Sequence, residues 1–190
     1  CGYIDPQGNL AIGFGFSQAF PFSQGLAVVE SNGKYGYINF KGDYVVPAQY
    51  DQAMSFSQGL AAVFVRSYEV SDPNNEGEVL LKPQSDIDSG FVSGSGQIAF
   101  LNREKGKWGF INPQGKVVIP FRYDWAWSFS RGLALVKSRD KWGFIDLAGN
   151  EVIAPQFEWA TYFGHGFAFV QNGQDQGYID RRGQYVWRKK

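Results

Sequence analysis

The fold is decided by one short stretch, Lys107-Trp108-Gly109-Phe110-Ile111-Asn112. It returns 34 residues later as Lys141-Trp142-Gly143-Phe144-Ile145-Asp146, and it stands earlier in the chain as Lys34-Tyr35-Gly36-Tyr37-Ile38-Asn39. Shorter versions are Gly2-Tyr3-Ile4-Asp5 and Gly177-Tyr178-Ile179-Asp180, so the five glycines are spaced by 34, 73, 34 and 34 residues. This regular spacing predicts a tandem array, in which the unit with the spacing of 73 carries 39 additional residues.

A second motif keeps the same period. The pattern Phe-Ser-x-Gly-Leu-Ala begins at Phe22, Phe56 and Phe129, and a variant of it begins at Phe163. A phenylalanine that recurs in every unit most simply fills the interface between neighbouring units. The Phe-Ser-x-Gly motif is therefore interpreted as part of the scaffold.

The local pattern predicts strands, although a period of 34 residues also occurs in helix-turn-helix repeats. Residues 108–111, 116–119 and 133–136 are short stretches of β-branched and aromatic side chains. Glycine or proline bounds such stretches every few residues, which an α-helix would not tolerate. The sequence therefore predicts an all-β fold.

Turn residues arrange these strands into three-stranded antiparallel meanders. Asp5-Pro6-Gln7-Gly8 and Asn112-Pro113-Gln114-Gly115 have the composition of a type I turn followed by a left-handed glycine, which is a common hairpin connection. Because Asp and Asn interchange at the first position, we interpret that side chain as structural. In the third unit the expected strands are 133–137, 141–145 and 151–153. Proline after the third strand, at Pro47, Pro120 and Pro155, is expected to turn the chain away.

The expected organisation is a single repeat array over residues 1–190. Its units are 1–33, 34–65, 106–140, 141–174 and a partial unit at 175–190, with an insertion at about 66–105 in the second unit. Residues 2–12 are expected to form a hairpin without the first strand of the meander. The units can close into a propeller-like ring or stack into an open solenoid-like array, and the sequence leaves both arrangements open.

The full pattern, Lys-Trp-Gly-Phe-Ile-Asp-x-x-Gly followed by Val-Ile-Pro and Phe-Ser-x-Gly-Leu-Ala, resembles the WG-containing repeat family of bacterial proteins. Trp108-Gly109 and Trp142-Gly143 carry the name motif, and Tyr35-Gly36 substitutes tyrosine. Outside the insertion the resemblance covers nearly the whole chain. It implies a β-repeat array, frequently in exported or surface-associated proteins, and it implies no catalytic residues.

Composition narrows the function classes. Lys plus Arg and Asp plus Glu both number 18, so no basic footprint for nucleic acid is present, and no apolar run approaches the ~20 residues of a membrane span. With one cysteine, Cys1, and one histidine, His165, the sequence predicts no cofactor, no metal site and no nucleophile–histidine pair. An enzyme built on two carboxylates stays an open alternative. Cys1 is either a lipidated N-terminus or a boundary of the piece, and an exported location is favoured over the cytoplasm.

Candidate binding residues are those that break the repeat. Trp125 and Trp159 occupy a position that holds Gln18 and Gln52 in other units, and Trp127 is likewise unmatched. They are either packed in the core or form an exposed aromatic patch for a peptide, a protein or a sugar ring.

The insertion is acidic and is the second candidate. It contains Asp86-Ile87-Asp88, which is too short a motif to predict a calcium site, and the apolar segments 79–81 and 98–101, which can form an extra hairpin.

The sequence thus predicts a non-catalytic binding scaffold, with a protein or peptide as partner. The alternative is a carbohydrate- or cell-wall-binding module of an exported bacterial protein. A glycosidase-like enzyme would need two carboxylates that face each other across a cleft.

Overall fold

The described part of the chain is built from strands alone. The computed structural model describes residues 1–71, 79–83 and 101–189, and for 67–71, 79–83 and 101–105 it describes the backbone only. Every regular element within these residues is a β-strand, which confirms the all-β prediction. Among the same residues there is no helix that could cross a membrane.

The strands form five antiparallel sheets, and each sheet after the first joins the end of one predicted unit to the start of the next. The N-terminal sheet is a hairpin of Tyr3–Ile4 (β1) and Leu10–Ile12 (β2). The next sheet contains Gln18–Ala19 (β3), Ala27–Ser31 (β4), Lys34–Ile38 (β5) and Tyr44–Tyr50 (β6). The third contains Gln52–Ala53 (β7), Ala61–Ser71 (β8), Leu101–Ile111 (β10) and Val117–Tyr123 (β11), with Val79–Pro83 (β9) along β8. The fourth contains Trp125–Ala126 (β12), Ala134–Ser138 (β13), Lys141–Ile145 (β14) and Glu151–Phe157 (β15). The last contains Trp159–Ala160 (β16), Ala168–Asn172 (β17), Asp175–Ile179 (β18) and Tyr185–Arg188 (β19).

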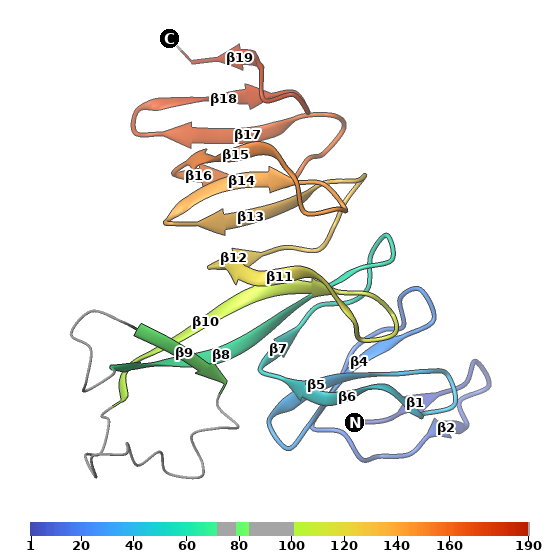
Figure 1. Ribbon diagram of the computed structural model, residues 1–190. Helices are drawn as coiled ribbons and strands as arrows, with labels where there is room; N and C mark the ends of the chain where they lie inside the picture. The colour runs from blue at the N-terminus through green and yellow to red at the C-terminus, as the bar shows by residue number, and fades with distance from the viewer. Residues whose placement is uncertain (72–78, 84–100, 190) are drawn as a thin grey trace.

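The sheets follow one another in sequence order from the N-terminus to the C-terminus (Figure 1). The two ends of the chain lie at opposite ends of the stack, so the units form an open, solenoid-like array and do not close into a ring. Each unit therefore contacts its neighbours along the chain, as expected for a repeat protein.

Each predicted three-stranded meander gains a short fourth strand. In the fourth sheet, Trp125 and Ala126 of the crossover pair with Lys137 and Val136 of β13. The same pairing occurs at β3, β7 and β16. A strand of two residues is too short to show the alternation of side chains that identifies strands, so the sequence predicts only a crossover before each meander.

The third strand of each meander continues past its proline, which corrects the expectation that proline ends it. β6 runs through Pro47 to Tyr50, and β11 and β15 run through Pro120 and Pro155. In each of them the pairing with the middle strand slips at this point, as between Trp142↔Phe157 and Phe144↔Ile153. A proline is tolerated at such a bulge on an edge strand because its missing N–H leaves no ladder bond unmade.

The glycine of the Trp-Gly motif lies opposite this bulge. A Cβ atom on Gly143 would lie 2.6 Å from the Ile153 carbonyl oxygen and 2.6 Å from the Pro155 nitrogen. The corresponding Cβ on Gly36 would lie 2.7 Å from backbone atoms of the bulged strand. Only glycine leaves room for the bulged backbone, so its recurrence is architectural.

The Asx turns have the predicted geometry. Asp146 Oδ1 accepts hydrogen bonds from the N–H groups of Ala148 and Asn150, both at 2.9 Å, and Gly149 has a positive φ of 84°. The same pair of bonds recurs at Asp5, Asn39, Asn112 and Asp180. The Phe-Ser-x-Gly motif is also a turn, because its third and fourth residues both have positive φ. His165 occupies the third position with a φ of 51°, so it is a turn residue.

Two contacts repeat at every seam between described units. The phenylalanine of each Phe-Ser-x-Gly motif packs on the aromatic residue after the motif Gly in the preceding sheet, as Phe129 packs on Phe110 with ring centroids 4.9 Å apart. The other three pairs, with centroids 4.7–4.9 Å apart, are Tyr3–Phe22, Tyr37–Phe56 and Phe144–Phe163. The Asx-turn glycines of the four larger sheets, Gly42, Gly115, Gly149 and Gly183, each lie on an aliphatic side chain of the preceding sheet, as Gly149 lies on Ile119. These contacts form the core between sheets, where Phe110 and Ile119 are fully buried.

The insertion extends one hairpin of the second unit. Strands β8 and β10 continue beyond the length of their counterparts and pair from Ala61↔Ile111 to Val70↔Leu101. Val79–Pro83 pairs with β8, so segment 79–81 is part of a hairpin with β8, and Leu101 also pairs with β8. Residues 98–100 of the predicted hairpin lie outside the described residues. Asp86 and Asp88 lie outside the described residues.

Candidate functional site

Four tryptophans from the third and fourth units line one cleft. Trp125 and Trp127 come from the crossover at β12, Trp159 from the crossover at β16, and Trp142 from β14. Together with Tyr162 they enclose about 350 Å³, and we call this feature the tryptophan cleft. Leu135, which is buried, lies among its lining residues.

The crossovers hold these side chains through backbone pairing with the first meander strand. Trp127 N–H donates to the Leu135 carbonyl at 2.9 Å, and Thr161 N–H donates to the Phe169 carbonyl at 2.9 Å. In an extended chain alternate residues share a face, so Trp125 and Trp127 are on one side of their crossover. Their positions are thus fixed by the short strands that the sequence did not reveal.

Trp125 belongs partly to the core. Its ring packs on buried Trp108, with ring centroids 5.2 Å apart, and meets Trp127 edge-on at 6.0 Å. Its Nε1 atom is shielded from solvent and has no hydrogen-bond partner among the residues that the structure describes. A buried indole N–H usually finds an acceptor, so this atom is exceptional.

Trp127 and Trp159 are exposed. Trp127 is 46% exposed and Trp159 is 55% exposed, and the latter meets Trp142 edge-on with centroids 6.4 Å apart. Edge-on contact leaves ring faces free for a ligand. Of the two alternatives drawn from the sequence, the packed one describes Trp125 and the exposed one describes Trp127 and Trp159.

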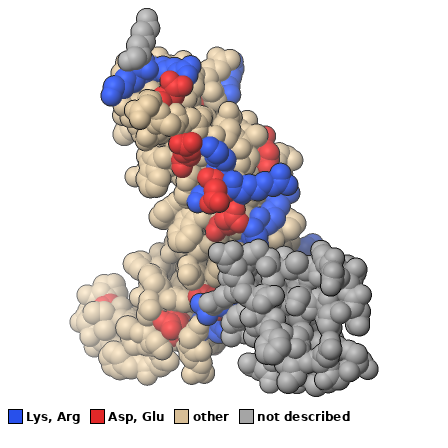
Figure 2. All heavy atoms as spheres, turned by 90° about the vertical axis from the view of Figure 1, so that its left-hand side faces the viewer, with Lys and Arg blue, Asp and Glu red and all other residues tan. Residues whose placement is uncertain are grey.

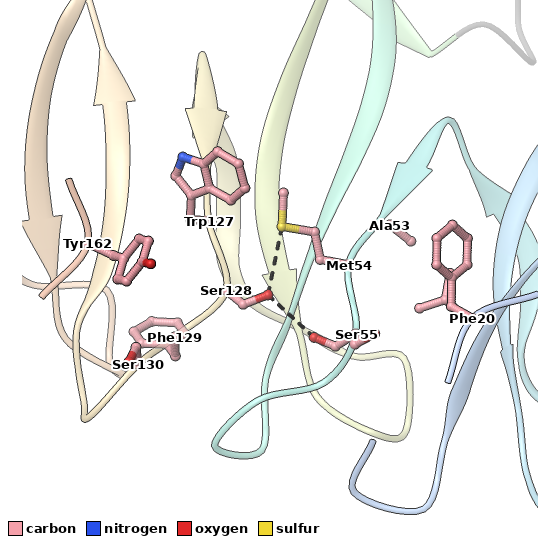
Figure 3. A pocket seen from close by; sticks show the side chains of 10 residues that line it. Phe20, Ala53, Met54, Ser55, Trp127, Ser128, Phe129, Ser130 and Tyr162 are labelled. Atoms are coloured by element: carbon pink, nitrogen blue, oxygen red, sulfur yellow. Dashed lines mark hydrogen bonds between the residues drawn. The ribbon is translucent and has the colours of Figure 1, made fainter. Parts of the chain in front are cut away.

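A second hollow continues from the same residues toward the N-terminal units. It encloses about 550 Å³, and its lining includes Phe20, Met54, Ser128, Trp127 and Tyr162. Figure 3 shows these side chains in a row across neighbouring crossovers, with Ser128 bonded to Met54 Sδ and to the Ser55 carbonyl. We call this second hollow the crossover groove. Because Trp127 and Tyr162 line both features, the groove and the cleft lie next to each other.

Tyr162 and Trp142 are lining residues that the sequence alone did not identify. Tyr162 is 70% exposed and replaces the serine found at positions 55 and 128, so its departure from the repeat was a detectable signal. Trp142 was assigned to the scaffold because it belongs to the Trp-Gly motif. Its exposure in the cleft depends on its neighbours, which the motif does not reveal.

Charged side chains lie away from the cleft and pair with one another. Glu158 contacts Lys141 at 3.4 Å and accepts a hydrogen bond from Gly173 N–H at 2.8 Å, and these contacts lower the pKa of its carboxyl. Asp51 makes the equivalent contacts with Lys34 and with Arg66 N–H of β8, and Asp124 makes them with Lys107 and Arg139 N–H. Burial acts to raise the pKa of Asp124, but the bonds from Lys107 and the backbone lower it overall. Glu158 and Asp124 thus each hold a hairpin turn, and Figure 2 shows the two signs intermixed on one face.

The described residues contain no group of three or more His, Cys, Asp or Glu that could hold a metal ion. The carboxylates with lowered pKa, Asp5, Asp124, Asp146 and Glu158, all occupy turn or clamp positions. None of them lines the tryptophan cleft or the crossover groove.

Comparison with known proteins agrees with the repeat geometry. A search of curated proteins found no significant match. The WG containing repeat matches the chain four times, at residues 2–35, 35–67, 108–142 and 142–174. These matches cover well over half of the sequence and correspond to the stacked units, with the insertion between the second and the third. The chain therefore belongs to the WG containing repeat family.

Proposed function

We propose that this protein is a non-catalytic scaffold that binds an extended polypeptide segment across its crossovers. The observation that carries the proposal is that the tryptophan cleft and the crossover groove lie next to each other and share Trp127 and Tyr162. The lining residues come from four successive units, so a bound chain would contact several units in turn. Exposed apolar surface rimmed by polar residues is typical of interaction sites.

The binding residues are separate from the residues that hold the fold together. Trp127, Trp159 and Tyr162 are exposed and stand at positions whose residue type varies between units, whereas the recurring Phe129 and Phe163 are buried at the seams. Aromatic side chains of this kind supply most of the binding free energy at protein interfaces. The scaffold therefore tolerates changes at the binding face that would be costly at the seams.

A carbohydrate is the second candidate ligand. It is favoured by Trp159, whose exposed ring suits stacking against a sugar. Sugars also need hydrogen-bonding partners for many hydroxyl groups. No charged or amide side chain lines the tryptophan cleft, and for this reason a polypeptide is favoured.

The proposal is tested by indole N–H signals in ¹⁵N nuclear magnetic resonance spectra, where the six tryptophans give one signal each. Titration with a pool of unstructured peptides is expected to move the signals of Trp127 and Trp159. The signal of Trp187, which is exposed on β19, is the internal control and should stay in place. Movement with chitohexaose or cellohexaose but not with peptides would favour the second candidate, and no movement with any of these would refute both.

A further inference from the structure

The surface of the tryptophan cleft is aromatic and almost wholly apolar. Five of its eight lining residues carry aromatic rings, namely Trp125, Trp127, Trp142, Trp159 and Tyr162. The others are aliphatic, apart from Thr161. Trp125 Nε1 is buried in the core and takes no part in this surface. A ligand that fills the cleft therefore needs an apolar exterior.

The tryptophan rings form two edge-on pairs, one from each of two neighbouring units. The planes of Trp125 and Trp127 make an angle of 61°, and those of Trp142 and Trp159 make an angle of 73°. Trp127 and Trp159 are half-buried. Because the two faces make up most of the surface of a flat ring, half-buried rings leave ring face open. The cleft is thus walled by rings that stand at steep angles to one another.

The polar character of this surface is negative. The faces of aromatic rings carry partial negative charge. Thr161 Oγ1 accepts one hydrogen bond, from Phe169 N–H at 3.0 Å, and keeps a second lone pair, while the Tyr162 hydroxyl is also an acceptor. No lysine or arginine among the described residues lines the cleft. These groups together favour a ligand that carries positive charge.

The lysines on the strands beside the cleft do not oppose such a ligand, because each is paired with a carboxylate. Lys137 of β13 lies 2.9 Å from Asp140, and Lys141 of β14 lies 3.4 Å from Glu158. Nearby opposite charges cancel much of each other's field at a distance. Neither lysine therefore brings an unbalanced positive charge to the rim.

The apolar lining also decides which kind of cation fits. A primary ammonium group is strongly hydrated, and its three N–H groups need acceptors. Within the described part of the chain no carboxylate lines the cleft to replace that water. A quaternary ammonium group has no N–H, and methyl groups cover its charge. It can therefore lie against aromatic rings without leaving a donor unsatisfied.

We propose that the tryptophan cleft binds a quaternary ammonium group, carried by a small cation, against the rings of Trp127 and Trp159. A cation is attracted to a ring face within about 6 Å of the ring centroid. The volume of about 350 Å³ is at the small end of ligand sites and suits a trimethylammonium head. The inference goes beyond the proposed function, because a small cation can occupy the cleft whether or not a polypeptide lies in the crossover groove.

The test titrates the intact chain with choline and with 3,3-dimethylbutan-1-ol, which has the same shape and no charge, while sodium chloride keeps the ionic strength constant. Choline is expected to move the indole N–H signals of Trp127, Trp142 and Trp159 and to leave that of Trp187 in place. It should bind about tenfold more tightly than the neutral alcohol, and ethanolamine should bind more weakly than choline. Equal binding of choline and the neutral alcohol would overturn the inference, because the cleft would then be an apolar pocket only.

Trp159→Leu keeps an apolar side chain and removes the ring face. It is expected to reduce the affinity for choline about tenfold and to leave that for the neutral alcohol unchanged. Trp187→Leu removes an equally exposed tryptophan outside the cleft and should change neither affinity. Choline binding that survives both Trp127→Leu and Trp159→Leu in folded variants would show that the cleft is not the site.

Phosphatidylcholine vesicles distinguish a free cation from the head group of a lipid. Choline binding without cosedimentation of the protein supports the free cation. Cosedimentation that free choline competes away would overturn the assignment to a free cation and place the same quaternary ammonium group on a lipid. The peptide titration tests the proposed function separately, so a failure of choline to bind would leave that proposal standing.

Discussion

Gly143 shows how little freedom the repeat leaves at its recurring positions. A methyl group there would meet the Ile153 carbonyl and the Pro155 nitrogen, both of them backbone atoms that cannot rotate away. Gly164, by contrast, has open space around the same position and no positive φ. The two glycines therefore form a matched pair for substitution.

Gly143→Ala is expected to lower the free energy of unfolding by about 1–3 kcal/mol, as overpacking does in other well-packed sites. Gly164→Ala should change it by less than about 0.5 kcal/mol. Urea denaturation followed by tryptophan fluorescence measures both. Equal stability of the two variants would contradict the role given to the Trp-Gly glycine.

Residue types that recur were predictable from the sequence, and residue environments were not. The buried Phe129 and the Asx turn at Asp146 follow from spacing and turn chemistry alone. Trp108 and Trp142 share a motif, but Trp108 is buried against Phe64 and Trp125, while Trp142 is only partly buried and meets Trp159 edge-on. That difference arises from the neighbouring unit, so no local pattern shows it.

The hairpin turn is the element that can be predicted most fully from the sequence. Each Asx side chain accepts hydrogen bonds from two backbone N–H groups. Asn39 and Asn112 accept the same pair of bonds as Asp146. The third strands were less predictable, since the bulge lets them continue through Pro47 and Pro120. Bulges depend on pairing with a partner strand, which the proline alone does not encode.

Asp146 makes the stability of its turn depend on pH. Its pKa is lowered from 3.8, first by the hydrogen bond from Asn150 and then by the backbone N–H groups. A carboxyl whose pKa is lower in the folded chain adds stability that is present above the unfolded pKa and is lost as the pH falls through the folded value. Asp146→Asn keeps the acceptor and removes the charge, so we expect a shallower loss of stability below about pH 4.

The urea midpoint at neutral pH and at several values below pH 4 measures this effect. Asn112→Asp is the reverse change in an equivalent turn and should make the acid loss steeper. Identical acid profiles for the wild type and both variants would show that the turn carboxylates do not contribute.

At the scale of the whole molecule the insertion is an addition to one hairpin. Two of the equivalent connections are two-residue turns with positive φ at both residues, Asn32-Gly33 and Arg139-Asp140. In the second unit Val65 and Lys107 pair at the corresponding place. The stack of units around this hairpin makes the same seam contacts as elsewhere.

Replacement of residues 66–106 by Asn-Gly is therefore expected to preserve the array. The N–H of the new asparagine is expected to donate a hydrogen bond to Asp51 in place of the Arg66 N–H. The Arg139 N–H donates the equivalent bond to Asp124 at a two-residue turn. The melting temperature should be equal to or above that of the parent, because a shorter loop costs less entropy to close. A large loss of melting temperature would show that the insertion supports the stack.

The open arrangement of the units could not be derived from the sequence, because it depends on how one unit rotates over the next. Hydrogen bonds across the seams fix that rotation, from Ser23 Oγ to the Phe56 carbonyl and from Gly59 N–H to Gln24 Oε1. The same bonds link Ser57 to Phe129 and Gly132 to Gln58 across the insertion. Their partners lie one unit apart and become visible only in three dimensions.

The tryptophan cleft is formed where two units meet, and its exposed residues Trp127, Trp159 and Tyr162 stand at positions that the repeated seam contacts do not use. Duplication of one unit in the gene would thus create a new interface between units, while the seam contacts would be copied unchanged. The crossover residues of the new unit that make no seam contact would be free to vary. Selection could then reshape the new cleft for another ligand at no cost to folding. In such a protein, the number of units would set the number of independent opportunities for recognition.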